Sequence, residues 1–189
     1  MLSKILSWFW YSSSSESSAP SRPQPLAARK PSEPGMFQKM RDMQLRTPPS
    51  EMGLTKTSDD QIVGICMEQS MGNAVMSLRC FMEGTVSLYF STGAAIIGVG
   101  QHEQGREKGL AFVKAASQFH EHFTPDQELA LPEGGQTRFI LLRFDGTFSA
   151  GALTEDLGEN RSPLSPLFHL GHEVITAARL IQENRSKEA

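Results

Sequence analysis

The chain has 189 residues, of which 39% are hydrophobic and 21% are charged, and its formal net charge at pH 7 is -3. These values are ordinary for a chain with one modest domain and some further sequence outside it. The charge is unevenly divided: residues 1–46 carry seven Lys or Arg against three Asp or Glu, whereas residues 60–189 carry ten against sixteen. Because an acidic domain repels phosphate backbones, we expect no nucleic-acid partner.

The first ten residues, MLSKILSWFW, form a short amphipathic patch with Leu2, Ile5, Leu6 and Phe9 at helical spacing. This patch falls well short of the roughly 20 apolar residues that a transmembrane helix needs. A weak contact of residues 1–11 with a membrane surface is one interpretation. A dispensable tail and a targeting segment are the others.

The sequence from Ser12 to Ser58 is dense in Ser and Pro, as in SSSSESS and TPPSE. Such a composition buries too little apolar surface to offset the entropy of ordering, so it predicts a disordered arm over residues 1–58. Within this arm, MFQKMRDMQLR (36–46) predicts one or two transient helical turns. A single domain is expected over residues 59–186.

Four strands are predicted at the start of this domain, over Ile62–Met67, Ala74–Met82, Thr85–Ser91 and Ala94–Val99. They are rich in alternating apolar residues and are separated by turn residues such as Met-Gly-Asn, Glu-Gly and Thr-Gly. The short links favour antiparallel pairing, because a parallel pair needs a longer crossover.

Two helices and a hairpin complete the predicted domain. The segment Gln101–Phe123 has helical periodicity, and the strands Arg138–Phe144 and Thr147–Leu153 are joined by an Asp-Gly pair, a strong hairpin signal. A second helix carries apolar residues at helical spacing from Leu167 to Ile181. The order β-β-β-β-α-β-β-α predicts an α+β domain, with an antiparallel sheet of five to six strands flanked by two long helices.

This order over residues 60–185 resembles the layout of profilin-like, longin-like and roadblock-like modules, which are small antiparallel sheets flanked by helices. The resemblance implies interaction surfaces and dimers. The stretches GTVSLYFSTGAAIIGVGQHE and SPLFHLGHEVITA are also similar to a bacterial family of small proteins. That second resemblance implies no activity and no functional residues.

Cys66 and Cys80 lie in strand-like runs and form no C-x-x-C pair, so neither a zinc site nor a thioredoxin-like motif is indicated. We expect both thiols to be reduced and buried, with a disulfide between them as the minor alternative. The apolar run ILSWFWY is too short for a cleaved signal peptide, so a cytoplasmic location is expected.

The turn Gly98-Val99-Gly100 precedes the first long helix. A helix N-terminus offers unsatisfied N–H groups and partial positive charge, so Gly98, Gly100 and His102 are candidate ligand-binding residues for an anion. The dinucleotide fingerprint is incomplete, because Gly105 falls two positions late and the Walker pattern is missing. A structural strand-to-helix corner is the favoured interpretation.

The pair His169 and His172 is the candidate metal site, because residues three apart share one helix face and neutral imidazoles bind zinc. Glu173 follows, but the pattern is not H-E-x-x-H, and a third ligand such as His102 has to come from elsewhere. The alternative is that one imidazole packs inward and the other faces water.

No framed nucleophile such as G-x-S-x-G occurs in the sequence. We therefore assign no catalytic residue and no cofactor, and expect a non-catalytic protein-interaction or regulatory module that binds a protein partner or a second copy of itself. The alternative is a small metal- or anion-binding enzyme with its site near the Gly98–Gly100 turn and the pair His169/His172.

Overall fold

The computed structural model describes residues 35–188, which belong to one compact unit. The amphipathic patch and the Ser/Pro-rich sequence of residues 1–34 lie outside the described residues, and so do the predictions made for them. Among the helices that are described, none is long and apolar enough to cross a bilayer.

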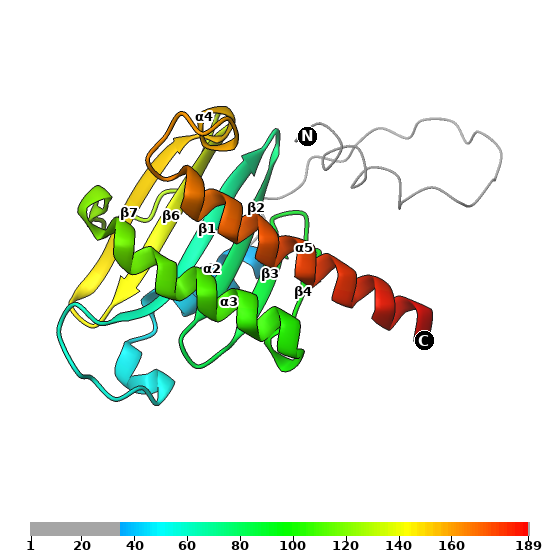
Figure 1. The fold of residues 1–189 in the computed structure, drawn as a ribbon, viewed down its shortest axis with the longest axis horizontal. Helices are drawn as coiled ribbons and strands as arrows, with labels where there is room; N and C mark the ends of the chain where they lie inside the picture. Colours follow the sequence, from blue (N-terminus) through cyan, green and yellow to red (C-terminus); the bar gives the residue numbers. More distant parts are fainter. Residues whose placement is uncertain (1–34, 189) are drawn as a thin grey trace. The chain divides into compact units, whose positions relative to one another are not determined.

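A seven-stranded antiparallel sheet forms the centre of this unit, in the order β4-β3-β2-β1-β6-β7-β5 (Figure 1). The predicted α+β class and antiparallel sheet are therefore confirmed. The two meanders β1–β4 and β6–β7 meet where β1 pairs with β6. The strands are β1 (Ile62–Met71), β2 (Ala74–Phe81), β3 (Val86–Phe90), β4 (Ala95–Ile96), β5 (Thr124–Pro125), β6 (Gln136–Arg143) and β7 (Gly146–Leu153).

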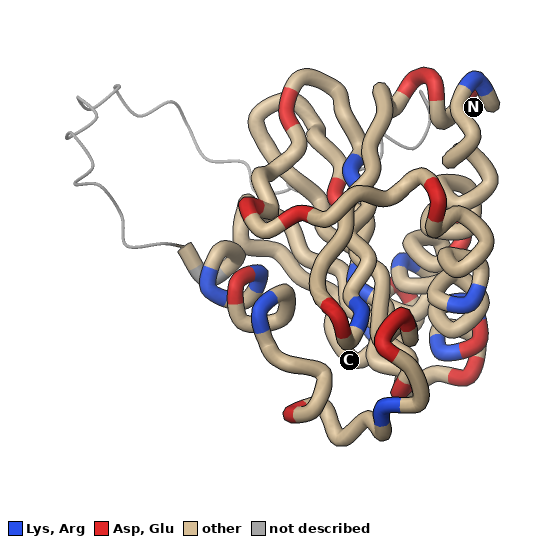
Figure 2. The backbone as a smooth tube through the Cα atoms, turned by 90° about the vertical axis from the view of Figure 1, so that its left-hand side faces the viewer, with Lys and Arg blue, Asp and Glu red and all other residues tan. Residues whose placement is uncertain are grey.

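Helices cover both faces of the sheet. In Figure 1, α3 and α5 lie side by side across one face, and α2 lies behind the other. Acidic and basic residues are interspersed along the described tube in Figure 2. The helical segments are α2 (Met36–Arg46), η2 (Pro49–Met52), η3 (Val99–Gln101), α3 (Glu103–Ala116), η4 (Ser117–His122), α4 (Thr154–Gly158) and α5 (Ser165–Glu188).

The first predicted long helix is shorter than expected. It ends at Ala116, and the chain tightens into the 3-10 turns of η4 before Phe123 is buried and β5 begins. The hydroxyl of Ser117 donates to the carbonyl oxygen of Lys114 at 2.8 Å and so occupies one of the free acceptors at the helix end. β5 is the strand beyond the predicted six.

The main core lies between the sheet and the α3/α5 layer. Gly171 of α5 sets the close approach there, because a Cβ at this position would lie 2.8 Å from Sδ of Met67 and 3.3 Å from the ring of Phe112. A helix with a larger residue at this point would have to move away from β1. The fully buried apolar side chains of this layer include Ile65, Met67, Leu78, Leu88, Phe112, Phe139, Leu167 and Phe168.

The domain begins earlier than residue 59. Residues 36–52, which the composition predicted as part of a disordered arm, form α2 and η2 against the second face of the sheet. Leu45 is 4% exposed and belongs to an apolar cluster with Cys66, Phe81 and Ile140. The composition was misleading because α2 is anchored by two buried side chains, and one of them is charged.

Cys66 and Cys80 are both buried and free. In the β1–β2 register, Cys66 is opposite Arg79 and Cys80 is opposite Ile65. Opposite residues share a face and neighbouring residues along a strand point to opposite faces, so the two thiols lie on different sides of the sheet.

Candidate functional site

The corner from Gly98 to His102 is closed by Arg185, which reaches back from the last turns of α5. Its Nη1 donates to the carbonyl oxygen of Ile97 at 2.9 Å, and its Nη2 donates to that of Gly98 at 3.2 Å. Nη2 also lies 2.9 Å from Nε2 of His102. Because a guanidinium only donates, Nε2 of His102 is the acceptor in this contact. The corner therefore presents carbonyl oxygens to a cation.

Steric constraints explain why both positions of this corner are glycine. Gly98 has a φ of 71°, in the left-handed region that favours glycine. A Cβ on Gly100 would overlap the carbonyl oxygen of Gly84, in the turn between β2 and β3. The N–H groups of Gln101 and His102 donate to carbonyl oxygens within the corner. The local geometry accounts for both glycines without a ligand.

His169 and His172 have different environments although they share α5. His169 is exposed, and its Nε2 donates to Oδ1 of Asn160 at 3.0 Å. The ring of His172 lies 4.3 Å from that of Phe168, and its Nε2 is buried without a hydrogen-bond partner among the described residues. Burial, and to a smaller extent His169, lowers the pKa of His172 to about 4. One imidazole packs inward and the other faces solvent.

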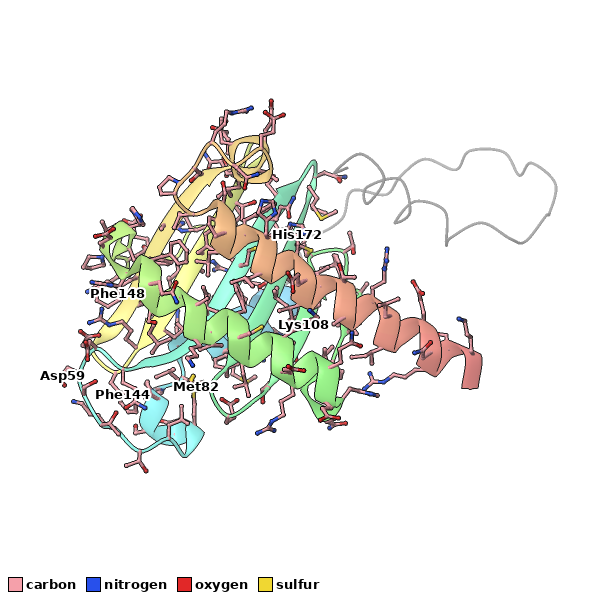
Figure 3. All side chains as sticks on the ribbon, in the orientation of Figure 1. Asp59, Met82, Lys108, Phe144, Phe148 and His172 are labelled. Carbon is pink, nitrogen blue, oxygen red and sulfur yellow. The ribbon has the colours of Figure 1, made fainter. Side chains whose placement is uncertain are left out.

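The three histidines considered as a metal set are not brought together. His169 and His172 line a groove of about 330 Å³ between α3 and α5, where Nζ of Lys108 lies 2.8 Å from Glu173 (Figure 3). His102 does not line this groove. Over residues 35–188, no three His, Cys, Asp or Glu side chains lie close enough together to hold a metal ion. Gly98 and Gly100 line a separate hollow of about 260 Å³.

Sequence reasoning missed a buried polar cluster between α2 and the sheet. Arg41 of α2 forms a bidentate ion pair with Glu68 of β1, with Nε–Oε1 and Nη2–Oε2 distances of 2.7 and 2.8 Å. The two side chains are 4% and 0% exposed. Nη2 of Arg41 also donates to the carbonyl oxygen of Leu129 at 2.6 Å. The α2 polar cluster, as we call it, consists of Arg41, Gln44, Glu68, Ser77, Arg79 and Tyr89.

Arg79 of β2 is the second cation of this cluster. Its Nε donates to the Ser77 hydroxyl at 3.1 Å, and its Nη1 donates to the carbonyl oxygen of Met40 at 2.9 Å and to the side chain of Gln44. The guanidinium lies 4.7 Å from the centre of the Tyr89 ring. Its Nη2 is buried and has no hydrogen-bond partner among the described residues. Burial lowers the pKa of Arg79.

The signal for this cluster is present in the strands. Glu68 and Ser77 are directly opposite each other, as are Ser77 and Tyr89, and Arg79 lies two residues along the same face. An antiparallel sheet with one solvated face alternates apolar and polar residues in this way. The alternation was visible in the sequence, but it does not reveal that a helix covers the polar face.

The two edges of the sheet differ in their protection. At one edge, β4 has two residues, and the chain that follows it is fixed by the contact between Arg185 and the carbonyl oxygen of Ile97. Short strands and covered backbone groups are common ways to protect an edge. The β4 edge is therefore short, and the chain that leaves it is held by Arg185.

The other edge is open along the end of β7. The N–H of Asp126 donates to the carbonyl oxygen of Thr147, so alternate residues of β7 from Thr147 onward direct their backbone groups toward β5. β5 pairs no further than Ser149. Beyond it, the N–H and C=O of Gly151 and the N–H of Leu153 point away from β6, and within the described residues no strand pairs with β7 on that side. The C=O of Leu153 begins α4, because Leu153 is the N-cap of that helix.

No protein-family model, curated protein or solved structure matches the chain. The contacts described above are therefore the basis for a proposed function.

Proposed function

We propose that this domain is a non-catalytic protein-interaction module that binds an extended segment of a partner protein along the open edge of β7. The observation that supports this function is the outward direction of the N–H and C=O of Gly151 and of the N–H of Leu153. An added strand would satisfy these groups, and strand addition at a sheet edge is a recurring mode of peptide recognition.

The surroundings of this edge suit an extended peptide. A groove of about 480 Å³ lies beside it, bounded by Thr124 of β5 and by Ala150 and Ala152 of β7. Small side chains leave room for those of an added strand. Leu153 is 51% exposed and offers an apolar contact at the end of the edge.

The groove also limits the chemistry of the partner. Arg138 lines it, but its guanidinium is engaged by Asp126, by the carbonyl oxygen of Ala130 and by the Ser149 hydroxyl. The cation is thus neutralised within the domain. A peptide with small or apolar side chains facing the groove fits this lining better than a strongly acidic one.

The substitution Leu153→Pro tests the proposal with little disturbance of the fold. Leu153 has φ -61° and ψ 133°, which proline adopts without strain. Its N–H faces outward, so proline removes an edge donor and leaves the β6–β7 ladder intact. The control Leu153→Ala shortens the side chain but keeps the N–H, and Leu180→Ala changes an apolar residue that is 40% exposed on α5.

The measurement is the affinity of peptides selected against the full chain from a library of extended peptides. We expect binding to fall at least tenfold in Leu153→Pro and to be unchanged in Leu180→Ala, because only the first removes an edge hydrogen bond. Hydrogen exchange should show slowed Gly151 and Leu153 amides in the complex. Peptides that bind Leu153→Pro as well as the unmodified chain, or that protect α5 instead, would refute the proposal.

A further inference from the structure

A hollow of about 400 Å³ opens between η2 and the sheet. Its lining comes from the end of α2, from η2, and from the ends of β6 and β7 that lie nearest to their connecting turn. Phe144, in that turn, is one of the lining residues (Figure 3). Ligand sites usually have volumes of roughly 300 to 1,000 Å³, so the η2 pocket, as we call this hollow, can hold a small organic molecule.

The lining of the η2 pocket continues the apolar cluster on the α2 side of the sheet. Leu45, Leu129 and Leu142 belong to that buried cluster and are 4% to 6% exposed. Met52 of η2 and Phe144 are partly buried against the same cluster. Apolar side chains that line a hollow lack dispersion contacts on that side. An apolar ligand would therefore complete the packing of this cluster.

Most polar side chains of the pocket already have partners within the domain. Nε of Arg143 donates to Oδ1 of Asp145 at 2.9 Å, so the charge of Arg143 is balanced. The hydroxyls of Thr47 and Thr147 donate to main-chain carbonyl oxygens. Arg46 differs, because its guanidinium forms no hydrogen bond or ion pair with any other described residue.

The charge of the lining favours an anion. Arg46 and Arg143 line the pocket, and no Asp or Glu of the described residues does. Because Arg143 is paired with Asp145, one positive charge remains unbalanced. A guanidinium can form two parallel hydrogen bonds with a carboxylate. Arg46 is exposed in the last turn of α2, so its long side chain is free to adopt that geometry.

We propose that the η2 pocket binds a small amphiphilic carboxylate, with its charged group on Arg46 and its aliphatic chain against Leu45 and Met52. One unpaired cation matches the single charge of a carboxylate better than the nearly double charge of a phosphate monoester. The lining of this pocket and that of the groove beside the β7 edge have no residue in common. The carboxylate site is therefore additional to the proposed peptide site and does not depend on it.

Calorimetric titration of the full chain with hexanoate, octanoate and decanoate, each below its micelle concentration, tests the proposal. Burying one CH₂ group strengthens binding about fourfold, so the affinity should rise with each lengthening of the chain. Octylammonium carries the same chain as octanoate but the opposite charge, and we expect it to bind at least tenfold more weakly. Octan-1-ol, which is uncharged, measures the contribution of the aliphatic chain alone.

The variant Arg46→Gln tests the charged end of the ligand. Arg46 is exposed, so the fold should tolerate the change. Octanoate should bind at least tenfold more weakly to this variant, because a charged hydrogen bond is lost, whereas the affinity for octan-1-ol should stay the same. Lys114→Gln removes an exposed cation from α3 and is the matched control. Equal affinity of octanoate for Arg46→Gln and the unmodified chain, or equal affinity of octylammonium and octanoate, would overturn the proposal.

A second variant, Met52→Trp, tests the position of the aliphatic chain by filling the pocket from η2. It should weaken octanoate and octan-1-ol alike by at least tenfold, with circular dichroism showing that the variant is folded. Leu153→Pro at the β7 edge should leave both affinities unchanged, so failure of the carboxylate site is distinguishable from failure of the peptide site. Undiminished binding to folded Met52→Trp, or no saturable binding of the three acids to the unmodified chain, would contradict the proposal.

Discussion

Arg41 of α2 and Glu68 of β1 form a two-point ion pair, with distances of 2.7 and 2.8 Å, where both side chains are almost inaccessible to water. Such a pair defines the position and orientation of a helix more than it adds to stability, because desolvation offsets most of the attraction. A buried Arg41 or Glu68 without its partner would therefore destabilise the docked helix. The ion pair thus fixes the position of α2 on the sheet but adds little to the free energy that holds α2 there.

The first prediction concerns the loss of one of these charges. Arg41→Leu leaves the Glu68 carboxylate buried without its partner, which costs about 3 kcal/mol or more. We expect α2 to leave the sheet, with the amides of residues 37–46 exchanging roughly a hundredfold faster by hydrogen-exchange mass spectrometry. The amides of β1 and β6 should change little.

The double variant Arg41→Leu/Glu68→Leu is the matched control for this loss. Two apolar side chains replace the pair, and apolar replacements of buried ion pairs are often neutral or stabilising. Protection of α2 should therefore return. Unchanged α2 protection in the single variant, or equal loss throughout the sheet, would contradict the expected local opening.

The second prediction uses the two thiols as reporters for the two faces of the sheet. Burial raises the pKa of Cys66 to about 12 and raises that of Cys80 well above its usual value. Because the thiolate is the reactive form, both should resist iodoacetamide at pH 8 in the folded protein. In Arg41→Leu, Cys66 should label faster, whereas Cys80, beneath Gly109 of α3, should not.

Mass spectrometry after timed quenching follows the two sites in one sample, and labelling in denaturant gives the reference rate for each thiol. A parallel rise at Cys66 and Cys80 would show that the variant opens the whole domain and not α2 alone.

The sequence predicted the hairpins of this fold well, because their signals are local. The hairpin of β6 and β7 forms as predicted, although its two-residue loop is Phe144-Asp145, one residue before the predicted Asp-Gly pair, and Gly146 already pairs with Arg143. The alternation in β2 likewise specifies a strand that pairs with its neighbours in the chain. The pairing of β1 with β6 and the docking of α2 were not predicted. Both join segments far apart in sequence, and α2 is fixed by Arg41 meeting Glu68 and Leu129.

The candidate sites show the same limit. Helical spacing indicates that His169 and His172 share a helix face, but not that Phe168 covers one ring and Asn160 binds the other. Likewise, the sequence indicated a turn at Gly100. The need for glycine there comes from the carbonyl oxygen of Gly84, which lies in a different turn. A sequence pattern predicts contacts between residues that are close along the chain. It does not predict contacts between segments that are far apart in sequence.

The third prediction separates the two glycines of the α3 corner. Gly98→Ala forces an alanine into the left-handed region, at a cost of about 1 to 2 kcal/mol. Gly100→Ala brings a Cβ into a backbone oxygen that cannot rotate away, so we expect a loss of about 3 kcal/mol or more. Urea denaturation followed by circular dichroism compares the free energies of unfolding. A smaller loss for Gly100→Ala than for Gly98→Ala would contradict the close packing of this corner against Gly84.

The last prediction concerns acid stability. The pKa of His172 is about 4 in the folded protein against 6.5 for an unperturbed imidazole, chiefly because of burial beside Phe168 and secondarily because of His169. The unfolded chain therefore binds a proton more readily than the folded one. The stability that the neutral ring provides is complete above pH 6.5 and is lost as the pH falls toward 4.

The expected loss from this one group is about 2 kcal/mol between pH 7 and pH 5, measured as the change in the free energy of urea unfolding. Carboxylates also titrate near the lower end of this range, so the informative quantity is the difference between the unmodified protein and His172→Leu, which lacks the titrating ring. The exposed His169→Gln serves as the matched control and should keep most of the pH dependence. If His172→Leu loses stability as steeply as the unmodified protein between pH 7 and pH 5, the buried imidazole is not the group responsible.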